Sequence, residues 1–153
     1  MPEVSIDLNM VRVTNEDFVK KAEACAPKLL ETVVKPVSIV DIVKTDSVYP
    51  DVKQKDSVEN LSQYHLAKGD KLCLDFGDHQ VGYVTLKLAS VGSPQDAPAF
   101  FRLKFGEIAK EMTEDSGDYD GWISRGWIQE EVIQVDGLPV ELKLPRRSAF
   151  RYM

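Results

Sequence analysis

The sequence predicts a mostly β protein: an antiparallel β-sandwich with one N-terminal helix and one short helical turn. Three runs of alternating apolar and polar residues carry this prediction, at residues 71–76, 83–88 and 100–105. Turn-forming Gly, Pro and Asp residues lie between the runs. A period of two that is repeated over three segments is typical of a sheet with one buried and one solvated face. We therefore expect these runs to form a meander of neighbouring strands.

The N-terminal part predicts a helix between two strands. Residues 4–13 alternate over a stretch that is marginal for a strand. Thr14 or Asn15 caps the helix, and acidic residues follow in its first turn, where the helix dipole favours them. Pro27 ends the helix near the residue before it. Residues 33–43 are rich in β-branched side chains and predict a strand.

The segments on either side of the central runs are less regular. Residues 44–60 are polar, rich in turn-forming residues and without periodicity, which predicts a connecting loop. Residues 61–66 predict a short strand that leads into the central runs. Beyond those runs, residues 108–112 predict a helical turn, and residues 114–126 predict a long acidic loop.

The C-terminal part predicts three more strands, at residues 127–135, 140–144 and 148–153. Pro145 separates the last two, because a proline cannot donate a hydrogen bond within a sheet. The last strand has no polar tail after it, so we expect a module or fragment of a longer protein. The chain is predicted to be one β-sandwich domain, residues 1–153, with a helix-and-strand lead-in (1–43), a loop (44–60) and a sandwich core (61–153).

Composition and charge exclude several classes of function. The formal net charge of −6 argues against nucleic-acid binding and against an anionic membrane surface, which both require clustered Lys and Arg. No apolar run approaches the roughly 18 residues of a membrane span. We see no signal peptide and therefore expect a cytoplasmic protein. Cys25 and Cys73 belong to no CxxC motif and are expected to be free thiols.

Nucleophilic catalysis requires a Ser or Cys beside a His that an acid orients. His65 and His79 are the only histidines, and no GxSxG turn is present. His79 lies in a glycine-rich corner, where its ring either fills the turn or contacts a ligand; the structural interpretation is favoured. We assign no catalytic residue.

Asp75 lies at the end of one strand-like run, and Glu107 follows another. These two carboxylates could act as a glycosidase pair. The favoured alternative is that each caps a turn or pairs with an arginine. Arg146 and Arg147, together with Arg151, are accordingly predicted as ion-pair partners for Glu107 or Asp75 rather than as anion binders.

The acidic loop over residues 115–121 invites comparison with a calcium loop. Asp118 and Asp120 fit the third and fifth positions of such a loop. Ser116 and Trp127 then occupy the first and twelfth positions, where a carboxylate and a bidentate Glu are needed, so the match fails at its ends. We expect neither a cofactor nor a metal site, with a weak calcium contact as the alternative.

Aromatic residues of the same loop suggest carbohydrate recognition. An apolar ring face stacks on sugar C–H groups while carboxylates bind hydroxyls. The alternative is that Trp122 folds back over an open end of the sandwich. The candidate ligand-binding residues are Tyr119, Trp122, Trp127, Asp118 and Asp120.

Several segments resemble a known family: LDFGDHQVGYVTLKL, DAPAFFRLKFGE and GWISRGWIQEEVIQVDGLPVELKLPRRSAFRY. They are similar to the non-catalytic β-sandwich region in front of the catalytic domain in glycoside hydrolase family 78, the α-L-rhamnosidases and relatives. The family pattern is a strand ending in DFG, a later Gly with a bulky residue, and a strand ending in GE. Here these are Asp75-Phe76-Gly77, Gly82-Tyr83 and Gly106-Glu107, within a resemblance over residues 60–152 that includes His79, Arg146 and Arg147.

The resemblance implies a jelly-roll or galactose-binding-like sandwich that packs beside a glycosidase. The family's catalytic acids lie in a helical (α/α)6-barrel, and no position of this chain matches them. The leading hypothesis is a non-catalytic accessory domain that gives structural support or binds a rhamnose-type carbohydrate, with a helical catalytic domain as partner. The alternatives are a free-standing lectin-like protein and a protein-interaction or assembly domain.

Overall fold

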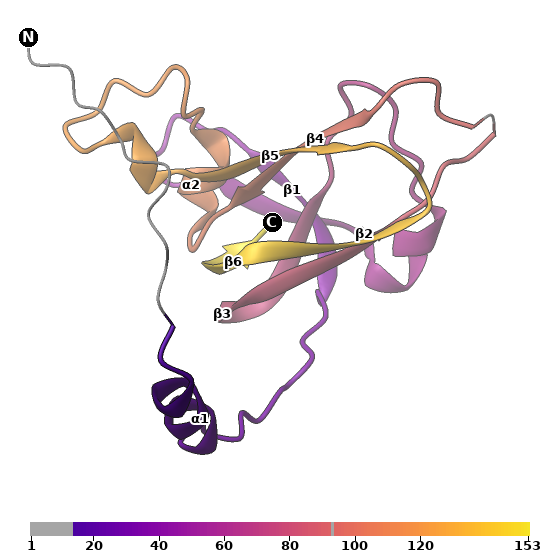
Figure 1. Ribbon diagram of the computed structural model, residues 1–153. Helices are drawn as coiled ribbons and strands as arrows, with labels where there is room; N and C mark the ends of the chain where they lie inside the picture. The colour runs from indigo at the N-terminus through magenta and orange to yellow at the C-terminus, as the bar shows by residue number, and fades with distance from the viewer. Residues whose placement is uncertain (1–13, 93) are drawn as a thin grey trace, which may run out of the picture. The chain divides into compact units, whose positions relative to one another are not determined.

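The computed structural model describes residues 14–92 and 94–153, and most of its regular secondary structure is β-strand (Figure 1). It confirms the predicted mostly β, antiparallel fold with an N-terminal helix. The chain divides into two compact units, Met1–Val33 and Val34–Met153. The strand predicted at residues 4–13 lies outside the described residues. Among the helices that the structure describes, none is long and apolar enough to cross a membrane.

The first unit contains helix α1 (Glu16–Ala24), none of whose residues is buried. As predicted, Asn15 caps this helix. Its side-chain oxygen accepts hydrogen bonds from the backbone N–H groups of Asp17, at 3.0 Å, and Phe18, at 3.2 Å. These bonds satisfy two of the donors that have no partner within the helix itself.

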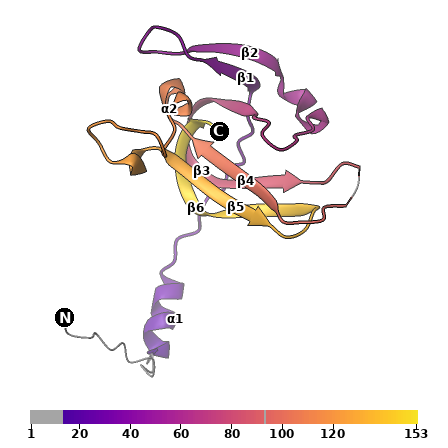
Figure 2. The ribbon, with the colours of Figure 1, turned by 90° about the horizontal axis from the view of Figure 1, so that it is seen from above.

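The second unit is built from two antiparallel sheets, shown in Figures 1 and 2. The larger sheet has the strand order β2-β1-β3-β6, with bounds Asp51–Ser57, Ser38–Val43, Cys73–Leu88 and Val140–Tyr152. The smaller sheet pairs β4 (Ala99–Phe105) with β5 (Gln129–Val135). Short helical segments join the strands: η1 (Val58–Gln63), α2 (Ala109–Thr113) and η2 (Arg125–Trp127). The helical turn predicted at residues 108–112 is confirmed by α2.

The core lies between the two sheets, on the faces that the alternation predicted to be apolar. Val84, Phe105, Leu144 and Phe150 are buried there in one cluster. The ring of Phe150 packs against Phe105 with 5.2 Å between centroids, and its contact with Phe76 is edge-on at 5.0 Å. Packing of β4 and β5 over β3 and β6, visible in Figure 2, confirms the sandwich. The jelly-roll and galactose-binding-like descriptions stay predictions.

The predicted meander of three neighbouring strands is wrong. Residues 71–76 and 83–88 belong largely to one long strand, β3, and the third run is β4 in the other sheet. Gly77, between the first two runs, lies in a bulge instead of a turn, because the register against β6 shifts between Asp75 and Gln80, whereas Gly82 pairs in register with Ser148. Gly77 has φ +79° within this bulge, a backbone conformation that glycine adopts at little cost.

Strand β6 also continues where a break was predicted. Thr85 of β3 lies opposite Lys143, but Tyr83 lies opposite Arg147, so β6 carries extra residues around Pro145. A bulge leaves its extra residues outside the ladder of hydrogen bonds, and a proline is therefore accommodated there.

Two further predictions fail between residues 44 and 66. Strand β2 lies within the predicted loop, and η1 followed by irregular chain replaces the strand predicted at residues 61–66. Strand β2 is an edge strand with the sequence DVKQKDS, and most of its residues are exposed. It therefore shows no apolar alternation, and its lysines are typical of edges that resist pairing with other chains.

We predict that Phe105→Ala lowers the free energy of unfolding by about 3–5 kcal/mol, because Phe105 is 1% exposed in the core and its removal leaves a cavity. Phe100→Ala in the same strand, where the side chain is 63% exposed, is the matched control and should cost less than about 1 kcal/mol. Urea denaturation of both variants measures the difference. Equal losses would contradict the placement of the core.

Candidate functional site

One candidate site lies where strand ends of both sheets meet. We call it the junction, and it consists of Asp75, Gly77, His79, Gly106, Glu107, Arg151 and Tyr152. Gly106 connects the sheets: its N–H donates to the carbonyl of Tyr152 at 2.9 Å, and its own carbonyl accepts from the N–H groups of Arg151 and Tyr152, both at 2.8 Å. A Cβ at this position would lie 2.9 Å from Sδ of Met112 and 3.2 Å from the carbonyl oxygen of Ile108, so a larger residue would require Met112 to move.

A bidentate ion pair fixes the same place. Arg151 Nε and Nη2 donate to the two carboxylate oxygens of Asp75 at 2.9 and 3.0 Å, and the N–H of Gly77 donates to Asp75 at 2.7 Å. Asp75 is buried, and the hydrogen bonds from Arg151 hold the pKa of its carboxyl below the ordinary value. A carboxylate with both oxygens occupied and a lowered pKa is unsuited to act as a general acid.

The other predicted junction residues have mixed outcomes. His79 Nε2 lies 3.5 Å from Glu107 Oε2, and both side chains are about half exposed. The predicted pairing of an arginine with Asp75 is confirmed for Arg151. It is wrong for Arg146, which contacts Glu131 at 3.0 Å because the bulge in β6 places it beside β5.

Gly82, which belongs to the family pattern, and Arg147, which lies in the segment that resembles the family, are both located within strands. Gly82 is not at a strand end as predicted; it lies inside β3 opposite Ser148. Arg147 lies opposite Tyr83 on the same pair of strands. Neither of these two residues takes part in the junction contacts.

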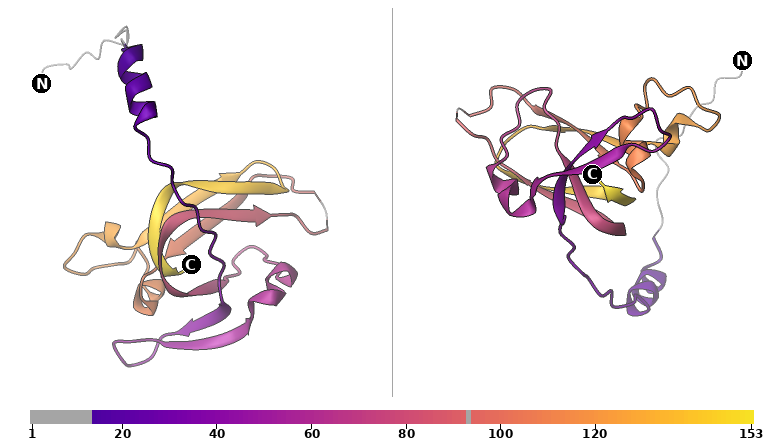
Figure 3. Two further views of the ribbon diagram at one scale, coloured as in Figure 1. Left: turned by 90° about the horizontal axis from the view of Figure 1, so that it is seen from below. Right: turned by 180° about the vertical axis from the view of Figure 1, so that it is seen from behind.

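A second candidate site is the loop over residues 114–127, which projects beyond the strands (Figure 3). We call it the aromatic loop. Trp122 is 96% exposed, which rules out the predicted alternative that its ring covers an open end of the sandwich. Tyr119 and Trp127 instead pack against each other, with 5.5 Å between ring centroids. The loop therefore presents a single indole ring to solvent, and Asp118 and Asp120 beside it are exposed as well.

Ion pairs and hydrogen bonds from charged residues of the smaller sheet hold the base of the aromatic loop in place. Arg102 contacts Asp115 at 3.2 Å and Glu130 at 2.8 Å. Lys104 contacts Glu130 at 3.2 Å and donates to the backbone carbonyl of Glu114. Burial of Glu130 opposes its ionisation, but hydrogen bonds from Ser116, Arg102 and Lys104 outweigh this and lower its pKa.

The sequence analysis did not identify Arg102, Lys104 and Glu130 as the residues that hold the base of the aromatic loop. Arg102 and Lys104 alternate with apolar residues in β4, and this pattern indicated only that they lie on the solvated face. Their partner Glu130 faces them only because of the β4–β5 register, in which Lys104 lies opposite Glu130.

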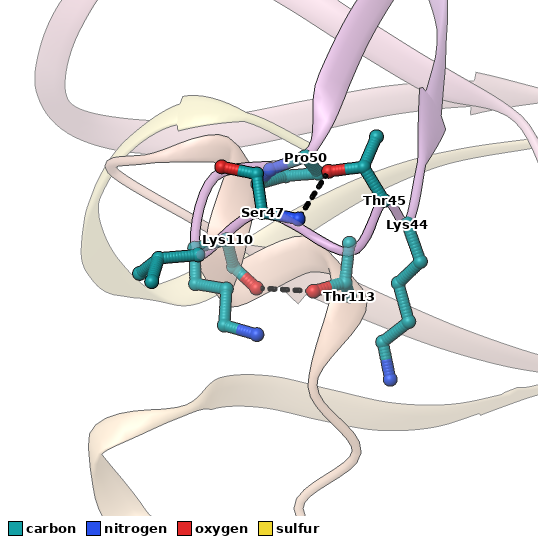
Figure 4. Close-up of a pocket in the computed structure, with 7 residues that line it drawn as sticks. Lys44, Thr45, Ser47, Pro50, Lys110 and Thr113 are labelled. Carbon is teal, nitrogen blue, oxygen red and sulfur yellow. Dashed lines mark hydrogen bonds between the residues drawn. The ribbon is translucent and has the colours of Figure 1, made fainter.

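A small hollow of about 130 Å³ lies between the β1–β2 connection and α2 (Figure 4). Figure 4 draws Lys44 and Lys110, one from each of these two elements, among the residues that line it. Lys110 already contacts Glu114 at 2.7 Å, and the hydroxyl of Thr113 donates to the carbonyl of Lys110. Lys110 and Thr113 are thus already engaged in contacts within and beside α2.

Metal and thiol chemistry find little support in residues 14–92 and 94–153. No three His, Cys, Asp or Glu side chains converge there in a way that could hold a metal ion, the acidic loop included. Cys25 and Cys73 are free thiols. Burial raises the pKa of Cys73 to about 12, which leaves it protonated and unreactive at neutral pH.

Comparisons with known proteins point to one family. The sequence pattern described as "Glycosyl hydrolase family 78 alpha-rhamnosidase N-terminal domain" matches residues 36–153. A solved structure, a rhamnosidase from Klebsiella oxytoca with rhamnose bound, is similar with a TM-score of 0.75 and 36% sequence identity. The match covers 92% of this chain but only 28% of the rhamnosidase chain. Among curated proteins, none matches.

We predict that Asp75→Asn lowers the free energy of unfolding by about 1–3 kcal/mol at pH 7, because it breaks an ion pair whose carboxylate is buried, although Arg151 is 39% exposed and partly solvated. A lowered carboxyl pKa stabilises the fold above the unfolded value of about 4, and this contribution is lost as pH falls further. The gap between wild type and variant should therefore shrink below about pH 4.

Asp41→Asn provides the control for this prediction, since Asp41 pairs with Lys55 at 3.2 Å while both side chains are about half exposed. Such exposed pairs contribute about 0–1 kcal/mol. Urea denaturation at pH 7 and pH 3 measures both variants. An Asp75→Asn loss that is the same at both values would argue against the ion pair as its cause.

Proposed function

Because the chain belongs to the family of glycosyl hydrolase family 78 alpha-rhamnosidase N-terminal domains, we propose that it is a non-catalytic accessory domain of a longer glycoside hydrolase. The partner in this proposal is a helical catalytic domain, which carries the catalytic acids in the family that the sequence resembles. The proposal is consistent with a chain that spans 28% of the length of the rhamnosidase it resembles.

The observation that carries the proposal is the role of the family motifs at the junction. Asp75 is committed to Arg151, and Gly106 joins the two sheets by backbone hydrogen bonds. These contacts hold the fold together and leave the carboxylate of Asp75 without the raised pKa that a glycosidase acid requires. The motifs thus serve the architecture, which suits a supporting domain.

Carbohydrate binding at the aromatic loop is a second candidate function. Trp122 is 96% exposed on a loop whose base is fixed by the ion pairs of Arg102 and Glu130. A large ring held in water on an anchored loop is suited to stacking on the apolar face of a sugar. The nearby carboxylates of Asp118 and Asp120 can accept hydrogen bonds from sugar hydroxyls and would repel acidic sugars. The proposed ligand is therefore a neutral sugar of the rhamnose type.

We predict that the purified chain releases no product from an aryl rhamnoside, because its proposed role is non-catalytic. Colorimetric assay over hours at high protein concentration measures this. Turnover that disappears in Asp75→Ala or Glu107→Ala would overturn the proposal, whereas turnover unaffected by these changes would indicate a contaminating enzyme.

We predict that the chain binds L-rhamnose and that Trp122→Ala weakens this binding about fivefold, in line with the roughly 1 kcal/mol contributed by aromatic contacts. Chemical-shift titration by NMR, with and without calcium, measures the affinity. Phe100→Ala removes an exposed ring elsewhere and should leave the affinity unchanged. No shift in the wild type would remove the sugar-binding function and leave the accessory role to be judged separately.

Docking of Trp122 on a second copy is the competing explanation for its exposure. A chain that sediments as a monomer independently of concentration would count against this assembly function. Concentration-dependent association that Trp122→Ala abolishes would favour it over sugar binding.

A further inference from the structure

The outer face of β3 and β6 carries a continuous row of exposed side chains. Val84 of β3 is buried, and the residues on either side of it point the other way, since successive side chains of a strand alternate between faces. Residues directly opposite in an antiparallel pair share a face. The register therefore places four cross-strand pairs in one row: Val81 with Ala149, Tyr83 with Arg147, Thr85 with Lys143, and Lys87 with Glu141. We call these eight residues the β3–β6 track.

The centre of the track is aromatic and open to solvent. Tyr83 is 72% exposed and Val81 is 57% exposed. With a rise of about 3.4 Å per residue, the row from Val81 to Lys87 is about 20 Å long. An exposed row of this length, interrupted only by the bulge between the Tyr83 and Thr85 pairs, suits an extended chain of several units better than a single small molecule.

The charges of the track distinguish it from the rest of the protein. Glu141 is its one carboxylate and contacts Lys87 at 3.6 Å and Lys143 at 3.4 Å. Arg147 has no carboxylate within 4.0 Å among the residues that the structure describes. Three bases against one acid make this face basic on a chain whose net charge is −6. Its electrostatic complement is an anion.

We infer that the β3–β6 track binds an extended saccharide whose units carry carboxylates, that is, a uronic-acid oligosaccharide. The ring of Tyr83 stacks on a sugar face, and the guanidinium of Arg147 beside it forms a bidentate pair with a carboxylate. Lys143, one pair further along the row and beyond the bulge, shares Glu141 with Lys87, so this group keeps one positive charge in excess for the next carboxylate. The choice of a saccharide over an acidic peptide rests on the proposed function, whereas the location and charge of the site rest on the register and the exposed residues alone.

The test compares oligogalacturonate with its methyl ester, which keeps the sugar chain but removes the negative charge. Titration calorimetry with the full chain at low salt should give binding to the free acid, at least tenfold weaker binding to the ester, and weakening of the acid's binding as salt is added. Tyr83→Ala and Arg147→Gln should each weaken binding to the acid about fivefold or more. Both side chains are exposed, so a thermal melt close to wild type confirms that the variants fold.

Two matched controls separate the track from the general surface. Lys53→Gln removes a base from the exposed edge strand β2, and Phe100→Ala removes an exposed ring from β4; neither should change the affinity. The inference is overturned if the acid does not bind at millimolar concentration, if the ester binds equally well, if poly-glutamate competes equally, or if the controls weaken binding as much as the track variants. Rhamnose binding that Trp122→Ala weakens is unaffected by any of these results, so the proposed function fails or stands separately.

Discussion

The hydrogen bonds between Gly106 and Tyr152 are the contact on which the rest of the second unit depends. They are the place where a backbone bridge joins the smaller sheet to the larger one. The ion pair of Asp75 with Arg151 fixes the neighbouring turn of the chain, and Phe105, immediately before the bridge, fills the core. Backbone bonds, ion pair and core packing thus reinforce one another at one end of the sandwich. This accounts for the family motifs in structural terms.

Local patterns in the sequence correctly predicted the features that depend only on neighbouring residues, namely strand alternation and the helix cap. The period of two identified β3, β4 and the apolar face of the core, and the cap at Asn15 was correct because it needs only its own next residues. Pairing between distant strands could not be predicted in this way. Gly77 and Pro145 indicated breaks, whereas in the structure they lie in bulges inside long strands, because tertiary pairing between β3 and β6 overrides the local turn signal. The exposed strand β2 has no apolar side to detect.

The same limit applies to the candidate sites. The sequence grouped Tyr119, Trp122 and Trp127 as one aromatic surface, but two of the rings pack on each other and only Trp122 is fully presented. The β3–β6 track could not be predicted from the sequence, because Arg147 and Lys143 belong to β6 and lie near Tyr83 only through the register of that strand. Residue types indicate which chemistry is available, and strand register decides which residues share a surface.

The position of β6 in the chain has a consequence for folding. Asp75 and Arg151 are 76 residues apart in sequence, and β3, which pairs with β1 only near its start, gains its long partner when the final strand is available. The chain must lose the entropy of closing this long loop before the contacts between the two strands form, and such pairing is therefore slow. During synthesis, β3 leaves the ribosome well before β6, so Val84 lacks the cover that Leu144 and Phe150 of β6 provide. The nascent domain therefore passes through a stage with an open apolar sheet, when it is most exposed to aggregation and to capture by chaperones.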